Sequence, residues 1–276
     1  MNFGVLFDFP TIMVLLVGLS GLIWAFDAAV LARRRRLTLS SLGEDVDREL
    51  AAKVMRAPTV VEYARSFFPV FLVVLVLRSF IAEPFRIPSN SMMPTLLTGD
   101  FILVNKFSYG IRIPVLGTKI ISIGQPDRGD VIVFKYPQDP STPFIKRVVG
   151  VPGDSIAYDN KWLYLNNEKI AQEELGTYTG YGSGVSMTGA SLRVEQLPGK
   201  AHEILVIESK RDGRVKPITL GEGEYFVLGD NRDNSRDSRF WGTVPDELLI
   251  GRAFTIWMNW DWGHGIDWGR IGSTID

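Results

Sequence analysis

The sequence predicts a mostly β domain that follows two N-terminal transmembrane helices. Two long apolar runs lie in the first 82 residues, and a basic stretch separates them. From residue 83 onward, short runs rich in β-branched and aromatic residues alternate with Gly, Pro, Asp and Asn, which is typical of antiparallel sheets in a sandwich or barrel. We therefore expect an anchored β domain of the sandwich or barrel type, with a β-rich subdomain inserted into it.

The first apolar run covers residues 9–26, which carry no charge, and residues 28–32 extend it past Asp27. This length suits a helix that crosses a bilayer, which needs about 20 residues. Four arginines, Arg33 to Arg36, follow the run, whereas a cleaved signal peptide carries its positive charges before the apolar segment. By the positive-inside rule, segment 1–32, with its helix at about 9–32, begins outside and 33–62 is a basic cytoplasmic loop. A buried core helix is the alternative.

The second apolar run, residues 66–77, lies between Arg65 and Arg78. The long side chain of Arg78 can extend to the membrane surface, so we predict a second transmembrane helix over 63–82. An interfacial or buried helix is the alternative. Two spans would return residues 83–276 to the outer side, and the loop between them is expected to be partly helical over 44–55.

Strands are expected in the second part of the chain at 101–104, 131–136, 144–149, 162–165, 204–208, 225–228 and 254–258. The core of this domain would consist of residues 83–155 and 225–276, with the inserted subdomain at 156–224. Asn166-Asn167 is typical of a two-residue hairpin turn. Residues 176–189 are rich in Gly, Ser and Thr, and we expect them to form a mobile loop.

Composition excludes several classes of function. The net charge of −1 argues against nucleic acid as a partner bound through bulk charge. The absence of cysteine excludes disulfides, Cys–zinc sites and Cys nucleophiles. The only histidines are His202 and His264, and the usual nucleotide, metalloprotease and hydrolase motifs are missing. We expect neither a metal nor a cofactor.

Three dense polar segments, 88–95, 146–154 and 229–242, carry the candidate chemistry. In the expected strand 144–149, alternation places Phe144, Lys146 and Val148 on one face. Desolvation there, together with Arg147 and other cations, would lower the pKa of Lys146 by several units and make it a neutral general base. The alternative is an ordinary charged lysine that reaches solvent.

Ser91 lies between Pro88 and Pro94, which stiffen its segment. A hydroxyl nucleophile needs an adjacent base, and no histidine lies in the polar segments. A Ser–Lys dyad is the remaining possibility, with the hydroxyl of Ser89 directed at an oxyanion. A turn serine is the alternative, because strand alternation does not place Ser91 beside Lys146.

Together these segments resemble the signature boxes of the bacterial type I signal peptidases (leader peptidases), in their Gram-negative two-span version. The matching segments are SMMPT at 91–95, KRVVGVPGD at 146–154 and GDNRDNSRDSR at 229–239. The resemblance covers about 83–258. It implies a membrane-bound serine endopeptidase that removes N-terminal signal peptides from exported preproteins. Cleavage would follow small residues at positions −1 and −3 and proceed through an acyl-enzyme.

The resemblance also implies roles for single residues. Ser91 would be the nucleophile and Lys146 its neutral base, while the Ser91 N–H and the Ser89 hydroxyl would form the oxyanion hole. Ser235 would hydrogen-bond to Lys146. Asp237 and Arg239 would form a supporting ion pair, with Asp230 and Arg147 nearby. Shallow apolar substrate pockets would be lined by Phe85, Ile87, Met92, Leu96, Phe144 and Ile145. This chain departs from the family at Asn90, where Gly is frequent, and at Arg236, where a small residue is common.

A multi-pass protein of the bacterial inner membrane, with its catalytic domain on the periplasmic side, is the implied location. The implied partners are secreted preproteins, the lipid bilayer and the protein-export translocon. Trp260, Trp262 and Trp268 favour contact of this domain with the membrane interface, and Trp257 fits either that contact or the core. Two other classes remain open, a non-enzymatic envelope protein and a Ser-His-Asp hydrolase that uses His202 or His264.

Overall fold

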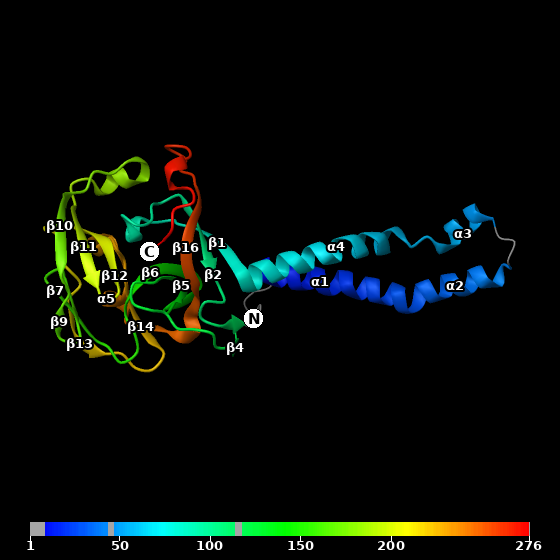
Figure 1. Ribbon diagram of the computed structural model, residues 1–276, viewed down its shortest axis with the longest axis horizontal. Coiled ribbons are helices and arrows are strands. Elements are labelled where there is room, and N and C mark those ends of the chain that lie inside the picture. Colours follow the sequence, from blue (N-terminus) through cyan, green and yellow to red (C-terminus); the bar gives the residue numbers. More distant parts are fainter. Residues whose placement is uncertain (1–8, 44–46, 114–117, 276) are drawn as a thin grey trace. The chain divides into compact units, whose positions relative to one another are not determined.

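A computed structural model describes residues 9–43, 47–113 and 118–275 of the chain. The chain divides into two units, which are helical up to Phe80 and rich in strands from Ile81 onward. Each unit is described by itself below. Figure 1 shows the elements of both units.

The helical unit contains two long apolar helices. The helices are α1 (Phe9–Phe26), continued by a π-helical turn (Asp27–Leu31) into α2 (Ala32–Ser41), then α3 (Arg48–Met55) and α4 (Thr59–Val76), which ends in a second π-helical turn (Leu77–Ile81). Residues 11–41 and 59–79 are long and apolar enough to cross a membrane. The prediction of two such helices is confirmed.

Helix bounds in this unit differ from those expected. The first helix continues through the four arginines to Ser41, and Arg35 forms a bidentate ion pair with Asp27 at 2.7 and 2.9 Å. The second helix begins at Thr59, directly after Pro58, rather than at residue 63. The predicted helix at 44–55 begins at Arg48, and residues 44–46 lie outside the described part of the chain.

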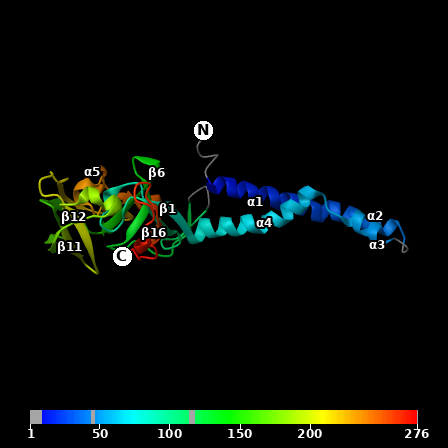
Figure 2. The same cartoon turned by 90° about the horizontal axis from the view of Figure 1, so that it is seen from above.

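Helices α1 and α4 lie side by side (Figure 2). The rings of Trp24 and Phe68 meet edge to face, with centroids 5.5 Å apart. Gly21 permits this approach, since a Cβ atom at its position would lie 2.9 Å from Cε2 of Phe68. The two apolar runs therefore form one antiparallel pair.

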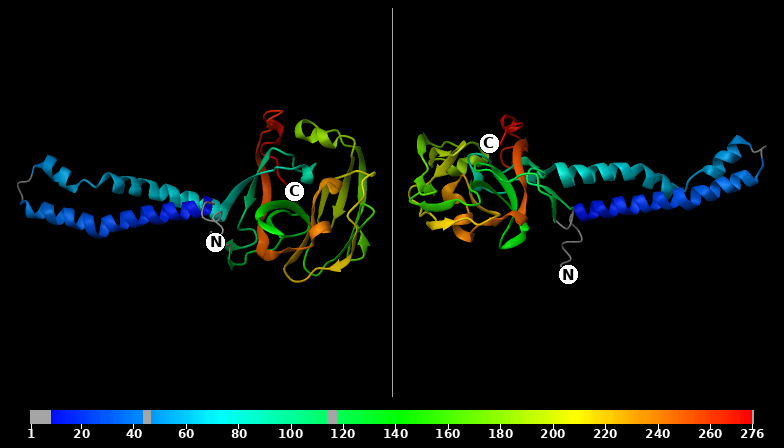
Figure 3. Two further views of the ribbon diagram at one scale, coloured as in Figure 1. Left: turned by 180° about the vertical axis from the view of Figure 1, so that it is seen from behind. Right: turned by 60° about the horizontal axis from the view of Figure 1, so that its bottom comes forward.

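The β-rich unit is built on a seven-stranded antiparallel sheet in the order β1-β2-β16-β5-β6-β14-β15. Its strands are β1 (Ala82–Arg86), β2 (Asp100–Asn105), β5 (Val131–Tyr136), β6 (Asp139–Gly150), β14 (Glu224–Leu228), β15 (Val244–Pro245) and β16 (Leu249–Asn259). Figure 3 shows β16 in orange beside the red C-terminal segment. The expected mostly antiparallel β fold is confirmed.

Residues 155–219 form two smaller sheets over most of the segment 156–224 that the sequence suggests is an inserted subdomain. One sheet contains β10 (Gln172–Thr177), β11 (Ser191–Leu197) and β12 (Lys200–Val206), and the other contains β13 (Val215–Thr219), β7 (Ser155–Asp159), β8 (Trp162–Leu165) and β9 (Glu168–Lys169). A short pair, β3 (Ile111–Arg112) with β4 (Lys119–Ile121), completes the strands. Asn166 and Asn167 form the predicted turn between β8 and β9, both with positive φ.

The segment 176–189 differs from the loop that the sequence predicts. Its first residues, Gly176 and Thr177, are the end of β10, and residues Gly182–Met187 form a 3₁₀ helix, η5. Met187 is buried in a cluster with Met93, Ala190 and Leu205. The small residues therefore serve close packing here, with Met187 supplying the apolar anchor that the Gly- and Ser-rich composition conceals.

Candidate active site

Ser91 and Lys146 come together in the β-rich unit although 55 residues separate them in the sequence. Ser91 lies in a single 3₁₀ turn, η4 (Asn90–Met92), which follows β1, and Lys146 lies on β6. Lys146 Nζ donates hydrogen bonds to Ser91 Oγ at 2.8 Å and to the carbonyl oxygen of Ile145 at 2.6 Å. Both side chains are buried, with Ser91 8% and Lys146 4% exposed.

Burial lowers the pKa of Lys146 from 10.5 to about 8, because the ammonium loses its water. The carboxylates of Asp237 and Asp230 oppose this shift. The sequence predicted the lowered pKa, but it attributed part of it to Arg147. That attribution is wrong, because burial lowers this pKa and the neighbouring charges that act on it are carboxylates.

Arg147 points to the other side of β6 from Lys146 and is fully buried. Its guanidinium donates to Asp230 at 2.9 and 2.8 Å and to the carbonyl oxygen of Gly129 at 2.7 Å. Thr95 donates a further hydrogen bond of 2.5 Å to Asp230. Burial alone would raise the pKa of Asp230, but Arg147 and these hydrogen bonds hold it below its usual range. This pair anchors the third polar segment beside the lysine strand.

Asp237 and Arg239 form the expected ion pair, with contacts of 2.8 and 2.9 Å. Asp237 also accepts a hydrogen bond from the backbone N–H of Gly229 at 3.0 Å and caps α5 (Ser238–Trp241). Arg239 lies over the ring of Tyr158, 4.9 Å from its centroid. Its guanidinium therefore links the third segment to strand β7 of the inserted region.

Ser235 does not make the hydrogen bond to Lys146 that the resemblance implied. Its hydroxyl is buried and has no hydrogen-bond partner among the described residues. The hydroxyl packs against Gly229, where a Cβ atom would lie 2.2 Å from Ser235 Oγ and 2.4 Å from the carbonyl oxygen of Ser91. Gly229 is therefore required for the close approach of the third segment to Ser91, and Ser235 is packed there without bonding to the lysine.

The six predicted pocket residues divide into two groups. Phe85 and Phe144 are partly exposed, in agreement with a surface role. The other four are buried in the core: Ile87, Met92, Leu96 and Ile145. Met92 and Leu96 have no exposed surface, so the expectation that they line an open pocket is wrong; they belong to the hydrophobic core. Ser89 is exposed, and its hydroxyl lies 3.4 Å from Ser91 Oγ.

Neither histidine bonds to Ser91 in the part of the chain that the structure describes. His202 is buried 3.3 Å from Arg232 and 3.5 Å from Glu195, and burial together with Arg147 lowers its pKa to about 4. His264 lies on the surface beside Asp261. Among the described residues, no group of three or more His, Asp or Glu side chains is arranged to hold a metal ion.

Three contacts around the site were not predicted from the sequence. Asn231 bonds to the backbone of both Asn90 and Ser91. Glu195 forms a fully buried bidentate ion pair with Arg232 at 2.7 and 2.5 Å. The one available signal was strand alternation, because Glu195 shares a face of β11 with the buried Leu197.

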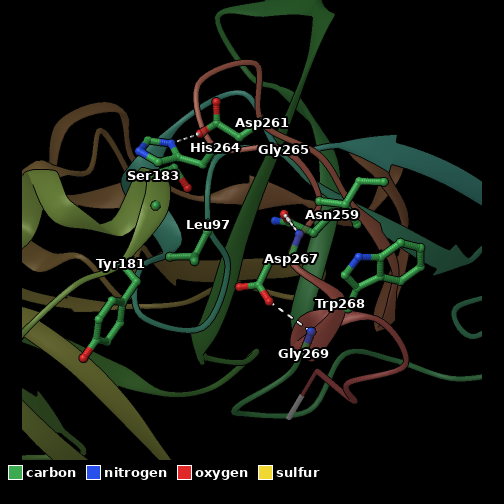
Figure 4. Close-up of a pocket in the computed structure, with 12 residues that line it drawn as sticks. Leu97, Tyr181, Ser183, Asn259, Asp261, His264, Gly265, Asp267, Trp268 and Gly269 are labelled. Carbon is green, nitrogen blue, oxygen red and sulfur yellow. Dashed lines mark hydrogen bonds and ion pairs between the residues drawn. The ribbon is translucent and has the colours of Figure 1, made fainter.

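A separate pocket of about 440 Å³ lies between η5 and the loop after β16 (Figure 4). Its lining includes Leu97, Tyr181, His264, Asp267 and Trp268. Figure 4 shows His264 directed at Asp261 and the Asp267 carboxylate directed at the backbone of Gly269. Ser91 and Lys146 do not line it, so the dyad lies outside this hollow.

Comparison with known proteins gives the family. The family described as "Signal peptidase, peptidase S26" matches residues 60–260. The chain belongs to this family. Signal peptidase I of Pseudomonas fluorescens is 46% identical over 272 residues, covering 92% of this chain and 93% of that protein. The Pseudomonas aeruginosa protein is 46% identical with the same coverage, and that of Haemophilus influenzae is 31% identical over 97% of this chain and 92% of its own.

Family membership confirms the resemblance stated from the sequence motifs, and it makes the chain a signal peptidase, a hydrolase that removes signal peptides. Its substrates are accordingly secreted preproteins. The crystal structure of a signal peptidase I from Enterococcus faecalis is 26% identical, with a TM-score of 0.29, and covers 48% of this chain and 98% of that chain. The two apolar N-terminal helices associate the enzyme with a membrane.

Proposed function

We propose that this signal peptidase cleaves its substrates with a Ser91–Lys146 dyad. The observation that carries the proposal is the 2.8 Å contact between Lys146 Nζ and Ser91 Oγ in a buried setting. A lysine whose pKa is lowered to about 8 has a substantial neutral fraction near that pH and accepts a proton from a hydroxyl. The dyad thus supplies both nucleophile and base without a histidine.

In the first half-reaction, neutral Lys146 takes the Ser91 proton as Oγ attacks the carbonyl carbon of the residue at position −1. The negative charge that develops on the carbonyl oxygen is bound by the Ser91 backbone N–H and the Ser89 hydroxyl. Protonated Lys146 then gives its proton to the leaving nitrogen, the C–N bond breaks, and an acyl-enzyme remains on Ser91. The released product is the mature protein with a new amino terminus.

In the second half-reaction, Lys146 removes a proton from water, and the resulting hydroxide attacks the acyl carbon. The bond to Ser91 Oγ breaks, and the proton returns from Lys146 to Oγ. The signal peptide leaves with a free carboxyl terminus. Asp230 with Arg147, and Asp237 with Arg239, support this site as charge-neutral pairs that hold the third polar segment against it.

We also propose how the substrate lies. Strand β1 is at one end of the seven-stranded sheet, and Phe85 on it is half-buried. An extended preprotein segment pairs with a strand edge in the β-augmentation mode, and Phe85 and Phe144 bound shallow sites for small residues at positions −1 and −3. The buried Ile87, Met92, Leu96 and Ile145 pack in the core rather than in these sites.

The proposal extends to the location of the enzyme. Residues 33–62 would face the cytoplasm, and residues 83–276 would form the catalytic domain on the periplasmic side of the inner membrane, where the export translocon delivers preproteins. Trp262 is 79% and Trp268 74% exposed, and the ring of Trp260 lies 4.6 Å from that of Trp262. Trp257, also 45% exposed, favours the membrane interface over the core, and this surface would contact lipid.

Cleavage of a preprotein by the full chain in detergent tests the dyad. We expect Ser91→Ala and Lys146→Ala to be inactive while His264→Ala stays active. For the lipid surface, the matched comparison is the Trp262→Ser and Trp268→Ser double variant against wild type. Its cleavage of a membrane-bound preprotein in vesicles should fall, with cleavage of a short soluble peptide unchanged. Equal loss with both substrates would contradict the lipid role and leave the dyad intact.

A further inference from the structure

The peptide bond between Asn90 and Ser91 is held by one residue of the third polar segment. Asn231 Nδ2 donates a 2.9 Å hydrogen bond to the carbonyl oxygen of Asn90, and the Asn231 backbone N–H donates a 3.1 Å bond to the carbonyl oxygen of Ser91. Asn231 is fully buried. Since a carbonyl oxygen only accepts, the amino end of the Asn231 amide must face Asn90.

This contact has a geometric consequence for catalysis. The carbonyl oxygen of Asn90 and the N–H of Ser91 belong to the same trans peptide unit, in which C=O and N–H lie in one plane and point in opposite directions. A hydrogen bond that fixes the carbonyl therefore fixes the direction of the N–H. That N–H is the backbone donor of the oxyanion hole in the proposed function, and such a donor acts only when it points at the developing charge.

The side chain of Asn90 holds the same peptide from the other direction. Asn90 Oδ1 accepts from Thr98 Oγ1 at 2.6 Å, and Asn90 Nδ2 donates to Ser186 Oγ at 2.9 Å. Ser186 belongs to η5, which contacts the segment a second time through the hydrogen bond from Ser183 to the carbonyl oxygen of Thr98 at 2.8 Å. The peptide plane is thus restrained at its carbonyl and at the preceding side chain.

Asn231 holds the Asn90 carbonyl although one atom of its own amide is left without a hydrogen bond. Its Oδ1 atom is buried and has no partner among the described residues. An unsatisfied buried acceptor destabilises the folded state, so stability alone does not account for an amide here. The inserted region fixes its place, because Leu205 of β12 bridges to Asn231 and donates to the carbonyl oxygen of Asp230 at 2.9 Å.

We propose that Asn231 is a positioning residue that directs the Ser91 N–H at the oxyanion, with the Asn90 side chain as its counterpart on the opposite side of the peptide. The proposal rests on the assigned roles of Ser91 and Lys146. It gives the inserted region 156–224 a function, since that region supplies both the strand that seats Asn231 and the η5 contact to Asn90. It also gives a role to the side chain of Asn90, which bonds to Thr98 and Ser186.

The test is the Asn231→Ala variant of the full chain in detergent, with Asn234→Ala as matched control. Asn234 lies in the same segment and is exposed. Loss of the Nδ2 donor frees the peptide plane, so we expect kcat to fall about 10- to 100-fold, with KM changed less than about twofold. The control should behave as wild type, and the pH dependence of kcat/KM should keep its position because Lys146 is untouched.

Two ligands distinguish a loss of N–H positioning from a general disruption of the substrate-binding cleft. Ser91 Oγ adds to the carbonyl carbon of a substrate-like peptide aldehyde. The product has an alkoxide in the oxyanion hole and the serine proton on Lys146. The corresponding peptide alcohol binds the same cleft without forming an oxyanion. We expect Asn231→Ala to weaken the aldehyde by the same factor as kcat and to leave binding of the alcohol unchanged.

Three results would overturn the proposal: an unchanged kcat, equal weakening of both ligands, or loss of activity with a shifted pH profile. If Asn231→Ala does not fold, as judged by its thermal midpoint, Asn90→Ala provides the same test from the half-exposed side, and equal affinity changes for both ligands would again contradict the role. Activity of Ser91→Ala would instead refute the dyad itself, so the two failures are distinguishable.

Discussion

Arg147 and Asp230 form a bidentate ion pair in the interior of the β-rich unit, and each side chain is only 1% exposed. Arg147 is the chain neighbour of Lys146, yet its side chain points to the other side of β6 and pairs with Asp230. The lowered pKa of Lys146 therefore arises from burial, and the nearby carboxylates limit the shift. The site therefore combines a buried lysine with two buried ion pairs that hold the third polar segment beside it.

The first prediction concerns the pH dependence of catalysis. The neutral form of Lys146 is the active base, so kcat/KM should rise with pH through about 8 as a one-proton limb. Rates of peptide cleavage between pH 5 and 10 measure this limb, and His264→Ala is the control that should not move it. A limb near 6.5 that disappears in a histidine variant would point to histidine as the base. His202, with a pKa of about 4, does not account for a limb near 8.

The second prediction concerns stability. In the folded chain Lys146 loses its proton near pH 8, and in the unfolded chain near 10.5. Below pH 8 the folded state carries a buried charge at a cost of about 3 kcal/mol, and this cost disappears between pH 8 and 10.5. Lys146→Met should therefore gain stability relative to wild type at pH 7, and about 3 kcal/mol of that relative gain should vanish by pH 10.5. Denaturant unfolding at the two pH values measures the difference, and a pH-independent difference would show that the folded-state pKa is not lowered.

The third prediction separates the carboxylates that act on Lys146. Asp237 is the strongest influence that raises its pKa against burial. Asp237→Asn should move the kcat/KM limb below pH 8, and it should cost about 3–5 kcal/mol of stability because Arg239 remains buried without its partner. Asp246→Asn, which removes a partly exposed partner of Lys119, should leave the limb in place. A limb that stays in place, or moves upward, in Asp237→Asn would contradict this electrostatic description.

The fourth prediction concerns topology. The chain contains no cysteine, so single cysteines report accessibility without background. Leu42 is 48% and Trp262 is 79% exposed. In cells, Trp262→Cys should react with a membrane-impermeant maleimide from the periplasmic side, whereas Leu42→Cys should react only after the inner membrane is permeabilised. Labelling of both positions from the same side would overturn the two-span arrangement.

Much of the fold could be predicted because its elements are encoded locally. Apolar length and the position of the arginines indicated two long helices, and β-rich runs between turn residues indicated the strands. Asn166-Asn167 marked a hairpin, because asparagine tolerates the positive φ values of 53° and 67° that the turn requires. The segment 176–189 has the composition of a loop, but it contains η5, whose Met187 packs in a tertiary cluster with Met93 and Leu205.

The site was predictable in its residues and only partly in its contacts. The motifs identified Ser91, Lys146 and the Asp237–Arg239 ion pair, but the approach of η4 to β6 depends on pairing across the whole sheet. The place of Ser235 depends on how closely Gly229 packs against it, which no local pattern encodes. Glu195 was overlooked because a single acidic residue in a strand signals nothing until its partner, Arg232, is known.

The central claim is that Lys146 in its neutral form activates Ser91, and the most direct test is the Lys146→Arg variant. A guanidinium keeps its proton at any pH at which the protein is folded, so it preserves the positive charge but cannot act as a base. Initial rates of preprotein cleavage by the full chain in detergent, at pH 8 and 9, should fall about 10³-fold or more in Lys146→Arg, as in Ser91→Ala, with the thermal midpoint of each variant confirming a folded protein. Retention of more than about a tenth of the wild-type rate by folded Lys146→Arg would contradict the account.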